Sequence, residues 1–386
     1  MKILHISDQP PGYISGGQLG ILQFSYAWTR IGSEVDYVGP EIENSNIAEW
    51  YNKTIYLNRQ LTAVEKIRSL VHLQFDRKYM SWKKLSLDFT QYDLIYIDFT
   101  KMAYVLKDIR KSGYRGHVIV RAHNVEADFF KINFYSKKTF VNYVKYKVMK
   151  PRERYMIKHS DKVLAITEVD KDRLIELYRI PEEKIDICPV GVNLPKSDIK
   201  LKTEIDSKLK CLITGSMWFG PNAEATKWFI ENVYPSVRSI CELTIAGFRP
   251  NSSLIQLCKN NSIRIVDSPK SMVPYFESAD MVLAPIFEGG GMKVKIAEAM
   301  SYGLPVVTTS HGAIGYNLKN NINIYVADEK KEFVNAIQKY FYMSVSERRI
   351  FLESEWSIYK KFYSLDAIEC ICKKIIKCRN HNYQQC

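Results

Sequence analysis

A glycine-rich segment near residue 290 carries the strongest chemical signal in this sequence. Three consecutive glycines (289–291) follow the apolar run MVLAPI (281–286), and a helical pattern begins at Lys293. Glycines between a strand and the N-terminus of a helix leave backbone N–H groups free to bind an anion, most often a phosphate. Lys293 and Lys295 add positive charge, and Glu298 lies three residues after Lys295 on the same helix face. The segment therefore predicts a nucleotide diphosphate site, with the glycines at the phosphates and Glu298 at the ribose hydroxyls.

This segment resembles the donor-binding segment of the family 4 retaining glycosyltransferases, which have the GT-B fold. The matching residues, in chain order, are GGGMKVKIAEAM (289–300), YGLPVVTT (302–309) and GAIG (312–315). A single glycine loop is weak evidence, but these motifs in this order and spacing are specific. The resemblance implies an α/β chain with two Rossmann-like domains that face one another across a cleft.

The resemblance also indicates which residues bind the donor. TGSMWFGPN (214–222) resembles the start of the family's second domain, with Asn222 expected at the N-cap of the next helix, and AGFRP (246–250) resembles a strand end beside the nucleotide. Residues 268–272 lie where the family usually holds the base. Two glycines in the first strand-to-helix turn are expected near the diphosphate and the acceptor, because a glycine turn at a helix start favours an anion. The expected donor-binding residues are Gly16, Gly17, Gly215, Ser216, Arg249, Ser268, Met272, Gly289, Gly290, Gly291, Met292 and Lys293.

His123 is the candidate sugar contact in the first domain. It ends the apolar strand HVIVRAH (117–123), and parallel-sheet proteins place their ligands at the carboxyl ends of strands. RAHNVEA (121–127) resembles the family's RxHNxE segment, whose His lies against the transferred sugar. We therefore expect His123, with Lys295 and Glu298, to be catalytic. Asn124 and Glu126 are the expected acceptor-binding residues, and both also shape the loop.

Two departures from the family pattern leave the donor open. Many members carry a Glu eight residues before the second Glu of the motif, and Gly290 occupies that position here. Many members also carry an Arg and a Lys in the loop after the first strand of the second domain, whereas SMWFGPN (216–222) has neither. Lys293 and Lys295 are the cations expected to neutralise the leaving diphosphate instead.

Short apolar runs alternate with helical patterns along the whole chain, which predicts parallel sheets with crossover helices. The polar, aperiodic stretch 193–209 separates two such series. We therefore expect an acceptor-side Rossmann-like domain at residues 1–192, a linker at 193–209 and a nucleotide-sugar-binding Rossmann-like domain at 210–345. The remaining residues, 346–386, are expected to be helical, with a long helical stretch over 352–376, and the resemblance implies that they cross back to the first domain.

Composition fits a soluble enzyme with a basic surface. The chain has 386 residues and a formal net charge of +13, with much of the excess in RKYMSWKKL (77–85) and KKTFVNYVKYKVMKPRER (137–154). No recognisable nucleic-acid motif accompanies this charge. We expect a cytoplasmic protein at the inner face of an anionic membrane, because basic segments with interspersed aromatic residues suit that surface. The N-terminus, MKILHISDQP, becomes polar too soon for a signal peptide.

Eight cysteines give no metal signal. Those at the C-terminal end lie near His381 but lack the Cys-x-x-Cys pairs of zinc sites. Free thiols in a reducing compartment are the simpler interpretation. We expect no metal and no cofactor other than a nucleotide-diphosphate sugar as co-substrate.

The function predicted from the sequence is retaining, metal-independent transfer from a nucleotide-diphosphate sugar to a glycan or lipid-linked acceptor, in bacterial surface polysaccharide or lipopolysaccharide assembly. Two alternatives stay open. One is a nucleotide-sugar 2-epimerase on the same fold, and the other is a non-catalytic partner subunit that keeps the nucleotide site. An NAD dehydrogenase is disfavoured, because no Gly-x-Gly-x-x-Gly follows the first strand.

Overall fold

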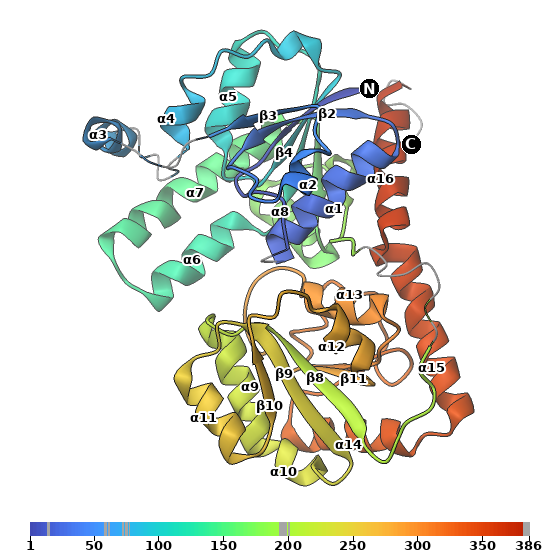
Figure 1. Cartoon of the computed structure of the whole chain (residues 1–386). Helices are drawn as coiled ribbons and strands as arrows, with labels where there is room; N and C mark the ends of the chain where they lie inside the picture. Colours follow the sequence, from blue (N-terminus) through green and yellow to red (C-terminus); the bar gives the residue numbers. More distant parts are fainter. Residues whose placement is uncertain are drawn as a thin grey trace. The chain divides into compact units, whose positions relative to one another are not determined.

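The computed structural model describes residues 1–13, 16–57, 60, 62–71, 73, 76, 78–192, 199 and 201–380. The chain divides into two compact units. Unit 1 comprises Met1–Val190 and Ile368–Cys386, and unit 2 comprises Gly191–Ala367. Each unit is a parallel sheet with helices packed around it (Figure 1). Parts of the sequence-based assignments lie outside the described residues, namely residues 14, 15 and 77, positions 193–198 and 200 of the expected linker, and the last six residues, 381–386.

The sheet of unit 1 has the strand order β3-β2-β1-β4-β5-β6-β7, and every pairing is parallel. All five residues of β4 are buried, as expected for a strand covered on both faces. The chain moves outward from β1 to β2 and β3 and then returns to the other side of β1, so the order reverses between β1 and β4. The strands are β1 (Lys2–Ile6), β2 (Glu34–Gly39), β3 (Lys53–Tyr56), β4 (Leu94–Asp98), β5 (His117–Ala122), β6 (Lys162–Ala165) and β7 (Ile185–Ile187).

Helices connect these strands and cover the sheet (Figure 1). The last helix, α16, belongs largely to unit 1, where Glu369 pairs with Arg30 of α1 at 2.8 Å. The helices are α1 (Gly16–Arg30), α2 (Ser45–Ala48), α3 (Ala63–Val71), α4 (Tyr79–Trp82), α5 (Ala103–Lys111), α6 (Glu126–Ser136), α7 (Phe140–His159), α8 (Glu168–Tyr178) and α16 (Leu365–Asn380), with 3-10 turns η1 (Phe89–Gln91) and η2 (Glu182–Lys184).

The sheet of unit 2 has the order β10-β9-β8-β11-β12-β13 and is also parallel. Its order reverses between β8 and β11. The strands are β8 (Leu209–Ser216), β9 (Cys241–Phe248), β10 (Arg264–Asp267), β11 (Met281–Ala284), β12 (Val306–Thr308) and β13 (Tyr325–Val326). The helices are α9 (Gly220–Asn232), α10 (Tyr234–Val237), α11 (Ser252–Asn260), α12 (Val273–Ser278), α13 (Val294–Ser301), α14 (Lys330–Tyr342) and α15 (Val345–Ile358), followed by the π-helical turn η3 (Tyr359–Tyr363).

The predicted α/β class and the two Rossmann-like series are confirmed, and two local predictions are wrong. The long C-terminal helix expected over 352–376 is broken at η3, where the buried Tyr359 donates a hydrogen bond to the carbonyl of Val192 (2.7 Å). Asn222, expected to cap the N-terminus of a helix, instead lies inside α9, which begins two residues earlier with Pro221 in its first turn. Its carboxamide is therefore available for the contacts described below.

Candidate active site

In unit 2, most of the predicted site residues gather where the strand order reverses. Open α/β sheets bind ligands at this point, outside the carboxyl ends of the strands. In unit 2 the glycine loop 289–291 follows β11, and Gly215 and Ser216 end the neighbouring strand β8. Arg249 follows β9, and Ser268 follows β10. The structure therefore brings the predicted donor residues of unit 2 to one edge of its sheet.

Lys293 organises the glycine loop. Its ammonium donates hydrogen bonds to the carbonyl oxygens of Gly289 (2.7 Å), Gly290 (3.0 Å) and Gly291 (2.9 Å). Gly289 and Gly291 have φ values of +110° and +68°, which residues with side chains rarely adopt. His311, which follows β12, also contacts this loop, with its Nε2 atom 2.7 Å from the Gly289 oxygen. Because three carbonyls face its ammonium, Lys293 holds the shape of the loop.

Lys295 is fixed at the end of β8. Its ammonium donates to the carbonyl of Thr214 (2.7 Å) and lies 3.4 Å from Oδ1 of Asn222. The amide of Asn222 donates in turn to the carbonyl of Ser216 (3.1 Å). Burial lowers the pKa of Lys295 to about 8, although the nearby Glu298 carboxylate opposes this shift. A Cβ atom on Gly215 would lie only 2.9 Å from the Lys295 ammonium, so this glycine leaves room for it.

Glu298 carries a carboxylate that is open to a ligand. It lies on α13, one turn after Lys295. Burial raises the pKa of Glu298, while the charge of Lys295 acts in the opposite direction. Among the residues that the structure describes, none donates a hydrogen bond to this carboxylate. Because partly buried carboxylates are normally hydrogen-bonded, Glu298 has the properties expected of a ligand-binding group.

The other predicted donor residues of unit 2 have different surroundings. The exposed Arg249 stacks its guanidinium on the ring of Phe248 at 4.9 Å, and its backbone N–H lies 3.2 Å from the Ser268 hydroxyl oxygen. Both Arg249 and Ser268 have positive φ values (51° and 49°). Met272 immediately precedes α12, and Met292 is buried next to the glycine loop. The arrangement places Arg249 and Ser268 on one turn and leaves the Arg249 side chain on the surface.

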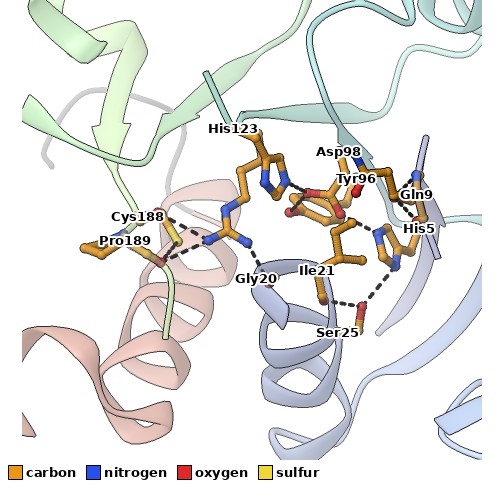
Figure 2. Close-up of polar contacts among 12 residues, drawn as sticks. His5, Gln9, Gly20, Ile21, Ser25, Tyr96, Asp98, His123, Cys188 and Pro189 are labelled. Atoms are coloured by element: carbon orange, nitrogen blue, oxygen red, sulfur yellow. Dashed lines mark hydrogen bonds and ion pairs between the residues drawn. The ribbon is translucent and has the colours of Figure 1, made fainter. Parts of the chain in front are cut away.

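Asp98 is the centre of a buried polar cluster in unit 1 (Figure 2). It ends β4, and it accepts a hydrogen bond from the hydroxyl of Tyr96 (2.7 Å). The Nε2 atoms of His5 and His123 lie 2.7 Å and 2.6 Å from its two oxygens. Burial opposes ionisation, but His123 and His5 together hold the pKa of Asp98 below its ordinary value. Asp98 therefore fixes the orientation of His123, whose ring also stacks on Phe99 at 4.2 Å.

Burial lowers the pKa of His123, although Asp98 acts in the opposite direction. A mostly neutral imidazole is therefore expected at neutral pH, and one ring nitrogen is held by Asp98. Next to it in β5, the buried Arg121 donates to the carbonyls of Gly20 (2.9 Å) and Pro189 (3.0 Å) (Figure 2). Gly20 lies on α1, four residues after Gly16, which opens that helix. Arg121 thus ties α1 and the segment after β7 to the strand that ends in His123.

Glu126 lies close to a second group of charges in unit 1. Its side chain is 3% exposed, and no described residue makes a hydrogen bond to its carboxylate. Burial raises the pKa of Glu126 to about 7, opposed by Lys101 and reinforced by Glu153 and Asp8. Lys101 pairs with Asp8 at 2.5 Å. Asn124, the other expected acceptor residue, is half-buried in the turn between β5 and α6.

Sequence reasoning did not single out several of these residues. His5 and Asp98 are polar residues with apolar neighbours on both sides in KILHIS and DLIYIDF, and this contrast was the available signal. Glu153 and the ion pairs of Asp8 gave no local signal, because their partners are far apart in the chain. The missed residues are His5, Asp8, Lys78, Tyr96, Asp98, Lys101 and Glu153.

Within the described ranges, His, Cys, Asp and Glu side chains nowhere form a group of three or more that could hold a metal ion. Cys386 and His381 lie outside those ranges. Among the helices of the described residues, none has both the length and the apolar character needed to cross a membrane.

Two family models match the chain. The model described as Glycosyltransferase Family 4 matches residues 14–196, and the model described as Glycosyl transferases group 1 matches residues 208–341. An uncharacterized 44.6 kDa protein in the cps region of Klebsiella pneumoniae is 22% identical over 364 residues, which cover 88% of this chain and 90% of that protein. The amylovoran biosynthesis glycosyltransferase AmsK of Erwinia amylovora is 24% identical over 186 residues, 44% of each chain.

Solved structures share the fold. A glycosyltransferase from Rickettsia africae matches with a TM-score of 0.70 and 15% identity, covering 99% of both chains. Anabaena HepE, in complex with UDP and glucose, matches with a TM-score of 0.66 and 14% identity, covering 98% of this chain and 99% of that one. At these identities the likeness concerns the fold, which is GT-B.

Proposed function

Since the chain belongs to the group 1, family 4 glycosyltransferases, we propose that it transfers a sugar from a nucleotide-diphosphate sugar to a glycan or lipid-linked acceptor with retention of configuration. The observation that carries this proposal is the edge of unit 2, where a glycine loop, a partly buried Lys295 and an open Glu298 carboxylate follow one another. These groups match the diphosphate and the ribose of such a donor. A donor of this type is the only co-substrate proposed, without a metal or other cofactor.

In the proposed reaction, the bond between the sugar and the diphosphate breaks while the acceptor hydroxyl oxygen attacks from the same face and passes its proton to the departing diphosphate. The departing diphosphate gains negative charge, and the loop N–H groups and Lys295 stabilise it. Preorganised donors of this kind are commonly the largest catalytic term. Glu298 binds the ribose, His123 contacts the transferred sugar, and Glu126 with Asn124 contacts the acceptor. Lys293 contributes by holding the loop carbonyls away from the diphosphate.

The proposed setting is bacterial surface polysaccharide assembly at the cytoplasmic face of the membrane. The support is the similarity to a glycosyltransferase of amylovoran biosynthesis and the high positive charge of the chain. An acceptor carried on a lipid would be presented at this surface. The sugar and the linkage are outside this proposal.

A thermal-shift panel of UDP-, GDP-, ADP- and dTDP-sugars tests the donor site. A sugar nucleotide present at about 100 times its Kd should stabilise the protein by about 2.7 kcal/mol. Glu298→Gln should reduce donor affinity by about 10- to 100-fold, because hydrogen bonds to charged groups contribute about 1.5–3 kcal/mol each. The matched control is Glu288→Gln, an exposed glutamate beside the same loop, which should bind like the wild type.

The outcomes separate the rival functions. If no sugar nucleotide stabilises the protein, the proposal is contradicted. Conversion of a sugar nucleotide to its epimer without any acceptor would indicate a 2-epimerase. Donor binding without transfer to any acceptor, in the presence of membranes from a polysaccharide-producing bacterium, would indicate a non-catalytic subunit. A 2′,3′-dideoxy nucleotide lacks the ribose hydroxyls that Glu298 is proposed to bind. It should therefore bind the wild type and Glu298→Gln with equal affinity.

A further inference from the structure

The segment from Phe129 to Lys150 has an unusual composition. Its 22 residues contain six lysines, seven aromatic residues and no aspartate or glutamate. The segment therefore contributes +6 to a chain whose total formal charge is +13. A concentration of positive charge among aromatic residues is typical of surfaces that meet an anionic partner.

In the structure this segment forms most of a helical hairpin. Helices α6 and α7 lie side by side, and the turn that joins them points away from the sheet of unit 1 (Figure 1). The turn is well built, since Thr139 caps α7 through the N–H of Asn142 (3.2 Å) and the Asn142 amide donates to the carbonyl of Lys137 (2.8 Å). Phe134 packs between the helices, with its ring parallel to that of Tyr146 at 6.1 Å. The hairpin is therefore an ordered element.

The hairpin exposes large apolar side chains. Single exposed apolar residues are common on protein surfaces, but a group of neighbours on one element marks an interaction site. Phe140 at the tip is 81% exposed and Ile132 is 63% exposed. We define the hairpin surface as these residues and their neighbours, with exposures between 43% and 81%: Phe129, Ile132, Tyr135, Phe140, Val141 and Tyr143.

Lysines surround this apolar group. Lys137 and Lys138 are exposed in the turn itself, beside Phe140. Lys147 lies over the rings of Tyr143 and Tyr146, at 5.4 Å and 5.6 Å from their centroids. The other basic segment of unit 1 is different, because the ammonium groups of Lys78 and Lys83 are paired with Asp8 and Asp108. Residues 129–150 of the hairpin thus combine basic charge with exposed aromatic residues and include no acidic residue.

We propose that the hairpin surface docks the enzyme on an anionic lipid bilayer, with the apolar side chains of the tip inserted at the level of the headgroups and the lysines paired with lipid phosphates. Charge complementarity selects this occupant: a bilayer supplies many phosphates in one plane next to an apolar layer, which matches lysines that ring an apolar tip. The inference rests on the proposed function, in which the acceptor is lipid-linked, and gives that acceptor a route to the protein.

The test is cosedimentation of the full chain with vesicles of phosphatidylcholine alone or mixed with phosphatidylglycerol. Binding is expected only to the mixed vesicles, and added salt should weaken it by screening the lysines. Lys137→Gln with Lys138→Gln should weaken binding about 25-fold, since each lysine near an anionic surface contributes a factor of about five. Phe140→Ser should weaken it at least about tenfold, because the phenyl ring would no longer be buried.

Matched controls are available in the same chain. Ile132 in the hairpin and Ile67 in α3 are both 63% exposed. Ile132→Ser should therefore weaken vesicle binding, and Ile67→Ser should leave it unchanged. Lys330→Gln with Lys331→Gln, an exposed lysine pair at the start of α14, is the corresponding control for charge.

Three results would overturn the proposal. They are no binding of the wild type to mixed vesicles, equal binding by the hairpin variants, and self-association through the hairpin surface that accounts for its exposed residues. The donor-induced thermal shift, measured on the same variants, keeps this test separate from the proposed function. A hairpin variant that loses vesicle binding but keeps the donor shift supports the docking role, and a wild type that binds vesicles but no donor would contradict only the glycosyltransferase proposal.

Discussion

Lys295 and Lys293 are two positions apart and use their ammonium groups differently. Lys293 faces three loop carbonyls, whereas Lys295 has a pKa lowered to about 8 by burial. A bound diphosphate would raise that pKa, so donor affinity should be full below about pH 8 and fall by up to about tenfold per pH unit above it. Isothermal titration calorimetry with a nucleotide diphosphate, from about pH 7 to about pH 9.5, measures this slope.

Substitutions of the two lysines test this assignment. Lys295→Met should abolish the alkaline loss of affinity and reduce turnover strongly. Lys293→Met should keep the slope, while lowering affinity at every pH because the loop loses the cation that its carbonyls face. An unchanged slope in Lys295→Met would show that a group other than Lys295 titrates.

His123 provides a test within unit 1. If it contacts the transferred sugar, His123→Ala should reduce turnover at least about tenfold, in the range typical of single catalytic contacts. Nucleotide diphosphate affinity should stay the same, because the proposed nucleotide contacts belong to unit 2. Asp98→Asn should reduce turnover less, since it leaves the imidazole in place while weakening the contact that orients it (2.6 Å). Full turnover in a folded His123→Ala enzyme would remove the proposed role.

At the residue scale, the sequence singled out candidate site residues but could not show their contacts. The glycine loop, Lys295, Glu298 and His123 were all accessible from local spacing. The bonds of Lys293 to the loop carbonyls were not, because residue type alone does not show where an ammonium points. The cluster around Asp98 joins His5 and His123, which lie on different strands, and only the sheet pairing brings them together.

At the element scale, α6 begins against a buried carboxylate. Glu153 of α7 accepts hydrogen bonds from the backbone N–H groups of Glu126 and Ala127 (both 2.9 Å), which open α6. It also accepts from the hydroxyls of Thr100 and Tyr178 (both 2.7 Å). An anion at a helix N-terminus compensates the unpaired N–H groups and the helix dipole. Glu153 therefore fixes the start of the helix that carries Glu126.

Glu153→Gln should destabilise the protein by at least about 2 kcal/mol, because its NH2 group would face buried donors and leave some of them unpaired. Urea unfolding followed by circular dichroism measures this loss. Glu176→Gln in α8 is the matched control, since that carboxylate is exposed, and it should change stability by no more than about 0.5 kcal/mol. A small effect of Glu153→Gln would mean that water replaces the lost bonds.

Most strands were predictable as elements, because buried parallel strands consist of continuous runs of apolar residues. Helix ends were less so. α9 begins at Gly220 rather than at Asn222, where an N-cap was expected, because Pro221 suits the first turn and Asn222 contacts Ser216 and Lys295 instead. The break at η3 depends on tertiary contacts of buried tyrosines, which helical periodicity does not encode.

At the scale of the whole molecule, the alternation of strands and helices predicted two parallel-sheet series, and both are present. The assignment of α16 largely to unit 1 was suggested by the family resemblance and not by the residues themselves. The residues could not show it, because a contact such as that of Glu369 with Arg30 joins opposite ends of the chain. Local pattern thus specifies each sheet, and long-range packing decides which unit receives the end of the chain.

The stability of the molecule should depend on pH through Glu355 of α15. Its side chain is 1% exposed, and neither carboxylate oxygen has a hydrogen-bond partner among the described residues. Burial raises its pKa well above the ordinary value of 4.5. Below pH 4.5 the group is protonated in both the folded and the unfolded chain, so it adds no pH-dependent term to the free energy of unfolding. As the pH rises above it, the unfolded chain ionises first, so the folded state loses about 1.4 kcal/mol per pH unit until the folded pKa is reached.

Urea unfolding of the wild type and Glu355→Gln, from about pH 5 to about pH 8, measures this contribution. A glutamine does not titrate, so the free energy of unfolding of the variant should rise steadily relative to that of the wild type as the pH increases. Any cost of burying the amide is the same at every pH and does not change this slope. Glu353→Gln, an exposed glutamate on the same helix, is the matched control and should follow the wild type throughout. Parallel pH profiles for the wild type and Glu355→Gln would show that Glu355 ionises in the folded protein at its ordinary pH, and hence that water reaches it.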